Sequence, residues 1–157
     1  MSSEVSGQQI APPLSSAADR PRHVVIVGFG LSGRTTVNSV IEHHISYTVI
    51  ETNPATVERC TPGGLNIILG DARDPEILRR AGIERATDIA VTVPEDQVTL
   101  DVVEQARKLN PQARIIARCT FVSGGMEAAR RGADDVITAE QVVASEFGRT
   151  IAAALER

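Results

Sequence analysis

Six short runs of mostly apolar residues recur along the chain, and each is followed by a stretch with helical periodicity. The runs are rich in β-branched residues and nearly continuous, which is typical of parallel strands that are buried on both faces. We expect strands at His23–Val27, Ser46–Ile50, Asn66–Leu69, Asp88–Val93, Arg114–Arg118 and Asp135–Thr138. The alternation of strands and helices predicts right-handed crossovers and a doubly wound α/β sheet with helices on both faces.

Capping residues and prolines mark the ends of the expected helices. Helix starts are expected at Asn53-Pro54, Asp74-Pro75 and Pro94–Asp96, where capping or acidic side chains adjoin proline. A short fifth helix is expected at Gly125–Arg131. Thr138 and Gln141 have the capping-box spacing for a last helix over about residues 139–156.

A glycine loop joins the first expected strand to the first helix, in the sequence HVVIVGFGLSG. Gly28 allows a tight turn, Gly30 lets backbone approach a pyrophosphate, and Gly33 lets the helix pack closely on the strand. Phosphate would then rest on free N–H groups at the helix start. The predicted phosphate-binding residues are Gly28, Phe29, Gly30, Leu31, Ser32 and Gly33. The Ser32 hydroxyl either reaches a phosphate oxygen or only caps the helix.

The two halves of the pattern, strands one to three and four to six, match the paired halves of a Rossmann sheet with strand order 3-2-1-4-5-6. The ligand crevice should lie at the carboxyl ends of strands one and four. Glu51, followed by Thr52, ends the second strand at the spacing where an acidic side chain accepts ribose hydroxyls. Such a carboxylate repels a 2′-phosphate, so NAD or a plain adenine nucleotide is preferred over NADP; the alternative is a strand-end carboxylate that only precedes a turn.

Other strand ends supply further candidates for the crevice. Asp71 and Ala72 follow the third strand and should border an adenine base, although a turn-forming aspartate would look the same. The remaining candidates at strand ends are Thr92, Val93, Pro94 and Arg118. Arg34 and Arg118 are candidate cations for phosphate. Alternatively, Arg34 faces solvent and Arg118 pairs with an acidic neighbour.

Composition places the chain among ordinary globular proteins. It has 157 residues, enough for one domain with a sizeable core, and a net charge of −4, which disfavours nucleic acid as a partner. Its two cysteines share no metal-like spacing, and no stretch approaches the length of a membrane helix. Residues 1–22 are rich in Ser, Ala, Pro and Gln and predict a disordered leader, so that the domain spans residues 23–157.

Residues for catalysis are scarce. The three histidines have no metal spacing, the only tyrosine, Tyr47, has no lysine four residues later, and the glycine loop is not a P-loop. Within these 157 residues the sixth strand is followed by a single helix, which leaves little room for a substrate domain. We therefore expect no catalytic residue and no metal; the alternative is an NAD-dependent oxidoreductase or its cofactor-binding fragment.

The motifs together resemble the N-terminal nucleotide-binding lobe of the regulators of potassium conductance, also called RCK-N, TrkA-N or KTN domains. The resemblance rests on VVIVGFGLSG, VIE, GDARDPEILRRAGIERA, VTVPEDQVTLDVVEQARKLNP, IIARC and GADDVITAEQVVA. They occur in order from His23 to about Ile151.

The resemblance implies a cytoplasmic, non-enzymatic sensor that binds NAD(H), or AMP, ADP or ATP, and gates a membrane cation channel, transporter or efflux system. It also implies a homodimer or higher homo-oligomer, with the last helix crossing to a partner lobe. Leu31 and Ser32 depart from members that carry an arginine inside the loop, which weakens the case for a triphosphate. The C-terminal lobe of many members is not in this sequence, so we expect either a lone N-lobe or a piece of a longer protein.

Overall fold

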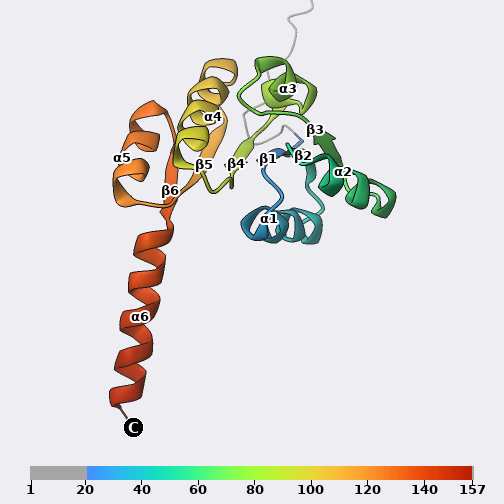
Figure 1. The fold of residues 1–157 in the computed structure, drawn as a ribbon. Helices are drawn as coiled ribbons and strands as arrows, with labels where there is room; N and C mark the ends of the chain where they lie inside the picture. The colour runs from blue at the N-terminus through green and yellow to red at the C-terminus, as the bar shows by residue number, and fades with distance from the viewer. Residues whose placement is uncertain (1–20, 157) are drawn as a thin grey trace, which may run out of the picture.

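A computed structural model describes residues 21–156, which form a six-stranded parallel sheet with order β3-β2-β1-β4-β5-β6 (Figure 1). The predicted fold class and strand order are thus confirmed. Of the predicted leader, residues 1–20 lie outside the described part. The strands are β1 (His23–Val27), β2 (Ser46–Glu51), β3 (Ile67–Leu69), β4 (Asp88–Val91), β5 (Arg114–Cys119) and β6 (Asp135–Thr138). β1 and β4 lie side by side in the middle, with Val27 opposite both Ile50 and Val91.

The helices follow the expected rhythm, one after each strand. They are α1 (Leu31–Glu42), α2 (Pro54–Cys60), α3 (Pro75–Arg80), α4 (Asp96–Leu109), α5 (Val122–Arg131) and α6 (Ala139–Leu155), with short 3₁₀ turns at Thr61–Gly63 and Ile83–Arg85. Asn53 and Asp74 cap α2 and α3 as predicted, each accepting a backbone N–H two residues later.

Three predicted boundaries were wrong by two or three residues, and one boundary each of β2, β3 and β5 was wrong by a single residue. β4 ends at Val91 and not at Val93, because Thr92 turns its hydroxyl onto the β1 carbonyl of Val27 at 2.8 Å. α4 begins at Asp96, so Pro94 lies in the loop before it. α5 begins at Val122, three residues before the predicted start at Gly125. Its first turns include Gly124 and Gly125, where close neighbours leave no room for a side chain.

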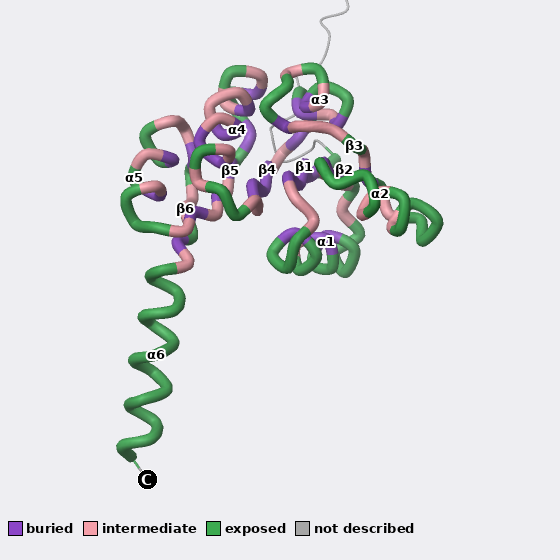
Figure 2. Tube along the Cα trace, in the orientation of Figure 1, coloured by how far each residue is buried: buried purple, intermediate pink, exposed green. Residues whose placement is uncertain are grey.

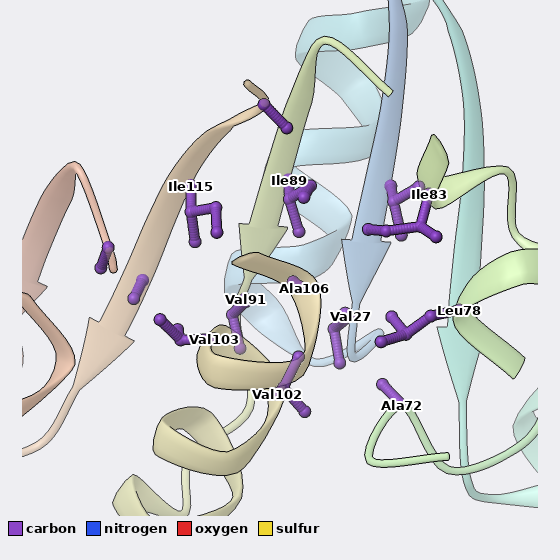
Figure 3. Packing of buried hydrophobic residues seen from close by; sticks show 14 of the residues in the cluster. Val27, Ala72, Leu78, Ile83, Ile89, Val91, Val102, Val103, Ala106 and Ile115 are labelled. Atoms are coloured by element: carbon purple, nitrogen blue, oxygen red, sulfur yellow. The ribbon is translucent and has the colours of Figure 1, made fainter. Parts of the chain in front are cut away.

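The sheet separates two hydrophobic cores. The larger lies between the sheet and α3, α4 and α5, where Val27, Val91 and Ile115 meet Leu78 and Val102 (Figure 3). The smaller lies between β1–β3 and the helices α1 and α2. Because β1 contributes alternate residues to both cores, all five of its residues are buried, as its continuous apolar sequence predicts.

Helix α6 leaves the sheet and extends away from the rest of the molecule (Figure 1). None of its residues is buried, whereas every other helix longer than seven residues has a buried stripe (Figure 2). The α1-side face of the sheet is also left partly bare at its β6 end, where Ile137 is 54% exposed. Thr138 occupies the predicted N-cap position, but its hydroxyl bonds the Gln141 side chain and no backbone N–H, so the capping box does not form.

Candidate functional site

A cleft of about 200 Å³ lies at the carboxyl edge of the sheet, between the ends of β1 and β4. Typical small-molecule sites have about 300–1,000 Å³, so the cleft itself encloses only part of a dinucleotide. Its lining comes from four loops: Val27, Gly28, Phe29 and Gly30; Ile50, Glu51 and Thr52; Gly70, Asp71 and Ala72; and Thr92, Val93, Pro94, Glu95 and Val98. The topology thus brings together residues from both halves of the sheet at the switch point of the strand order.

The glycine loop shows a different constraint at each glycine. Gly28 has φ +94°, a conformation that side chains disfavour, and turns the chain sharply off β1. A Cβ on Gly33 would lie 2.1 Å from the Gly28 carbonyl oxygen, so only glycine lets α1 pack here, as predicted. A Cβ on Gly30 would meet no protein atom within 4 Å, so no contact inside the protein requires glycine at this position.

The start of α1 is suited to an anion. Gly30 is the N-cap and supplies no side chain, and the first turn contains no acidic residue. The N–H groups of Leu31, Ser32 and Gly33 have no acceptor within the helix, because the acceptors would lie before its start. These donors and the positive end of the helix dipole favour a phosphate beside Gly30.

Glu51 links the glycine loop to the loop after β2. Its Oε2 accepts the N–H of Phe29 at 2.9 Å, and its Oε1 accepts the N–H of Asn53 at 2.8 Å. The Thr52 hydroxyl donates more weakly, at 3.4 Å. Each carboxylate oxygen retains acceptor capacity, so the group is held in place with room for the hydroxyls of a ribose. The ribose contact stays a prediction.

Asp71 lies in the loop after β3, next to the end of β2, and is paired with Arg73. The Arg73 guanidinium donates to both carboxylate oxygens, at 2.6 Å and 3.0 Å to Oδ2 and at 3.1 Å to Oδ1. These hydrogen bonds lower the pKa of Asp71 below its ordinary value, so the group is ionised at neutral pH. A base that bonds Asp71 must therefore share this carboxylate with Arg73, and Ala72 beside it is buried in the larger core.

Four of the predicted site residues do not line this cleft. Leu31 is 85% exposed, and Gly33 is buried under the loop. Ser32 and Arg118 instead line a separate, mostly apolar groove between α1 and the start of α6, together with Ile116, Ile137 and Val142. Arg118 donates to the Val93 carbonyl at 3.4 Å, and the Arg34 guanidinium lies 5.5 Å from the Phe29 ring centre.

The charged side chains that line the cleft are all acidic. The residues that line it include Glu51, Asp71 and Glu95 and no lysine or arginine. In residues 21–156 no group of His, Cys, Asp and Glu side chains is arranged to hold a metal ion. A phosphate in this cleft would therefore depend on backbone N–H groups and the helix dipole, which suit few phosphate charges better than many.

Sequence reasoning missed five of the lining residues: Val27, Ile50, Gly70, Glu95 and Val98. Gly70 had a signal, because it directly follows the third strand in the sequence ILGDA, at the same edge as the glycine loop. Its N–H donates to the Glu51 carbonyl at 3.0 Å, which ties the two loops together. Val98 had none, since its helical spacing marks it only as a core residue of α4.

Comparison with known proteins gives the same picture over most of the chain. The family model described as the TrkA-N domain matches residues 24–139. The putative cation/proton antiporter YbaL of Escherichia coli (strain K12) is 31% identical over 134 residues, covering 85% of this chain and 23% of YbaL. The glutathione-regulated potassium-efflux system protein KefC of Cronobacter sakazakii is 29% identical over 119 residues, covering 76% of this chain and 19% of KefC. The chain thus spans about a fifth of the length of these curated relatives.

Solved structures agree. The crystal structure of the TrkA-N domain of E. coli YbaL superposes with a TM-score of 0.79 at 29% identity, covering 84% of this chain and 98% of that one. GsuK bound to ADP superposes with a TM-score of 0.71 at 26% identity, covering 82% of this chain and 33% of GsuK. A GsuK channel bound to NAD shares the fold, with a TM-score of 0.68 at 20% identity, covering 82% of this chain and 23% of that one.

Proposed function

Because the chain belongs to the TrkA-N domain family, we propose that it is a nucleotide-sensing regulatory domain that controls a cation transporter or channel. The observation that carries the proposal is the convergence of Gly30, Glu51 and Asp71 on one cleft at the switch point of the sheet. The backbone at Gly30 would bind phosphate, Glu51 would accept hydrogen bonds from the ribose hydroxyls, and Asp71 would accept a hydrogen bond from the base edge.

The proposed ligand is an adenine nucleotide whose ribose carries no 2′-phosphate. Glu51 disfavours NADP, since its carboxylate repels a 2′-phosphate. A lining with three carboxylates and no basic residue favours NAD(H), AMP or ADP over ATP. The complexes of GsuK with ADP and with NAD support this ligand class.

The domain acts by differential binding and not by turnover. The cleft lining contains no histidine, cysteine, lysine or tyrosine, and the Glu51 carboxylate is already occupied by two backbone N–H groups. A nucleotide changes the output only as far as it binds one arrangement of the assembly more tightly than another. The rival function, a fragment of an NAD-dependent oxidoreductase, would have to use Asp71 or Glu95 for proton transfer, and Asp71 is already paired with Arg73.

The partner within the assembly is a second copy of the chain. Val143, Phe147 and Ile151 form an apolar stripe at four-residue spacing on α6 and are 61%, 68% and 51% exposed. The groove beside α6 presents further apolar side chains, Ile116, Ile137 and Val142. Two copies related by a two-fold axis bury both surfaces reciprocally, because each copy supplies one helix and one groove.

The membrane partner is a cation transporter or channel in another chain or in a further segment. The names of YbaL and KefC, a cation/proton antiporter and a potassium-efflux protein, support this choice. No helix within residues 21–156 is long and apolar enough to cross a membrane. We place the domain on the cytoplasmic side, where adenine nucleotides are available.

A thermal-shift panel followed by calorimetry tests the proposed function. At equal concentration, NAD, NADH, AMP and ADP should raise the melting temperature in the order of their affinities, and ATP and NADP should raise it less. No shift with any adenine nucleotide would refute the proposal. Loss of the nicotinamide absorbance in a substrate screen, with bound NADH oxidised, would instead support the oxidoreductase.

A further inference from the structure

Thr120, in the loop between β5 and α5, contacts two segments that are far apart in sequence. Its hydroxyl donates to the Pro94 carbonyl at 3.1 Å, and its N–H donates to Asp96 Oδ1 at 2.6 Å. Its carbonyl accepts the N–H of Glu140 at 3.1 Å. Every polar group of Thr120 is therefore used, two toward the loop that lines the cleft and one toward the first turn of α6.

Asp96 fixes the cleft side of this connection. It lies in the first turn of α4, where the helix dipole favours a carboxylate, and its Oδ2 also faces the N–H of Phe121 at 3.4 Å. A Cβ on Gly124 would lie 2.3 Å from Oδ2, so the space that a side chain would occupy is filled by the carboxylate. Pro94 and Asp96 flank Glu95, which lines the cleft, so both anchors move with that wall.

Glu140 fixes the α6 side. Besides its N–H bond to Thr120, its side-chain Oε2 accepts the N–H of Val122 at 3.2 Å. The rest of α6 is exposed, so its direction depends on β6 and on these bonds at its first turn. A 17-residue helix is about 25 Å long, so a small tilt at the first turn displaces the far end several-fold more.

We infer that Asp96, Thr120 and Glu140 form a linkage that transmits nucleotide occupancy of the cleft to the orientation of α6. This inference rests on the proposed function, since it assumes a nucleotide against Pro94 and Glu95. Ordering of that loop by the ligand stabilises the two bonds to Thr120, and Thr120 in turn holds the start of α6. The three are positioning residues, and none of them needs to touch the ligand.

Two backbone amides report on the linkage directly. The N–H groups of Val122 and Glu140 lie in the first turns of their helices, so neither has a helical acceptor, and their protection from solvent exchange comes from the linkage. Amide exchange measured by NMR on the full chain, with and without saturating NAD and AMP, therefore follows the linkage at single-residue resolution. We expect either nucleotide to slow exchange of both amides by about fivefold or more.

Thr120→Val removes only the hydroxyl that bonds Pro94 while keeping the side-chain shape, and Glu140→Ala removes only the acceptor for Val122. Both variants should bind nucleotide as the wild type does by calorimetry, and both should lose most of the ligand-induced protection at the α6 end. Ser123→Ala, an exposed change in the first turn of α5, is the control and should keep it. Unchanged transmission in both variants would overturn the inference, as would protection that stops at the cleft loops in the wild type.

A ligand-free arm separates this result from a failure of the proposed function. Gly124→Ala presses a methyl group against Asp96 and should speed exchange of the Glu140 amide without any nucleotide. If no nucleotide binds but Gly124→Ala has this effect, the linkage stands mechanically and the sensing function fails. If nucleotide binds and Gly124→Ala leaves Glu140 unchanged, the function stands and the linkage fails.

Discussion

The carboxylate of Glu51 accepts the backbone N–H of Phe29 at 2.9 Å, across 22 positions of sequence. A residue at the end of β2 thus holds in place the glycine loop that follows β1. The same carboxylate accepts the N–H of Asn53 with its other oxygen, so both loops depend on a side chain with two acceptor oxygens. The carboxylate that we predict to bind ribose is therefore also part of the scaffold of these two loops.

Glu51→Gln is expected to weaken both roles. The amide group replaces one acceptor oxygen by a donor that faces a backbone N–H, so one loop bond is lost and about 1–2 kcal/mol of unfolding free energy with it. Affinity for AMP and NAD should fall about tenfold or more, measured by calorimetry. Glu58→Gln is the matched control, because Glu58 is exposed on α2 and does not line the cleft. Equal affinities in wild type and Glu51→Gln would remove Glu51 from the ribose site.

Gly30→Ala separates ligand contact from folding. No protein atom lies within 4 Å of the added methyl group, and the backbone at Gly30, with φ −74°, suits alanine. The melting temperature should therefore stay close to that of the wild type, while nucleotide affinity falls because the methyl group occupies the place of a phosphate. Normal nucleotide affinity of the Gly30→Ala protein would show that phosphate does not approach the backbone at this position.

Gly33→Ala is the contrasting substitution in the same loop. Its methyl group would lie 2.1 Å from the backbone oxygen of Gly28, so α1 must move away from the loop. We expect a loss of stability of about 1–3 kcal/mol or more, in the range of overpacked cores, seen in urea denaturation. A stable Gly33→Ala protein would mean that the helix can shift without cost.

The sequence predicted all six strands of the sheet because each strand carries its own signal. β-branched runs such as Val24–Val27 are covered on both faces, and the change from a continuous apolar run to a period of 3.6 marks each crossover. Strand order then followed from the two halves around the glycine loop, without any long-range information. Boundaries were less certain at Val93 and Gly125, where contacts from distant residues decide the backbone.

The candidate site was predicted less completely, because side-chain direction depends on which face of the sheet a strand end presents. Arg118 and Ser32 were candidates for phosphate contact by their positions along the chain; they line the groove on the α1 side, and their contact with phosphate stays a prediction. The pairing of Asp71 with Arg73 and the linkage through Thr120 have no periodic signature at all. Polar contacts between loops are read from coordinates, whereas apolar periodicity is read from sequence.

Phe147→Asp is expected to disrupt the dimer. Phe147 is 68% exposed on α6 and contacts no core residue, so the fold of the monomer should survive, as far-ultraviolet circular dichroism would show. A charge in the centre of the apolar stripe should shift the mass by light scattering from dimer to monomer. Ser145→Asp adds the same charge on the polar side of the same helix, beside Glu146 and Arg149, and should leave the dimer intact. A wild-type chain that is monomeric at high concentration would contradict the assembly.

His23 is expected to make stability depend on pH. The ring is 2% exposed, and its Nε2 bonds the Ala81 carbonyl at 2.9 Å while Nδ1 bonds the Ser46 hydroxyl at 2.6 Å. A carbonyl only accepts, so Nε2 carries the hydrogen and Nδ1 accepts from Ser46. Burial lowers the pKa of His23 below its ordinary value of 6.5; the carbonyl of Ala81 opposes this shift and the charge of Arg85 adds to it.

The sign of the effect follows from which state binds the proton. Below pH 6.5 His23 becomes protonated in the unfolded chain, whereas burial keeps it neutral in the folded chain. The contribution of His23 to the unfolding free energy is therefore fully present above that pH and is lost as the pH falls. Asp71 and Asp135, whose pKa values are lowered by Arg73 and Arg114, lose their contributions only in a more acidic range. Urea denaturation at about pH 7.5 and about pH 5.5 therefore isolates the histidine. Wild type should lose more stability over this interval than His23→Gln, whose amide keeps a donor for Ala81 but does not titrate; parallel losses in the two proteins would assign the pH dependence to other groups.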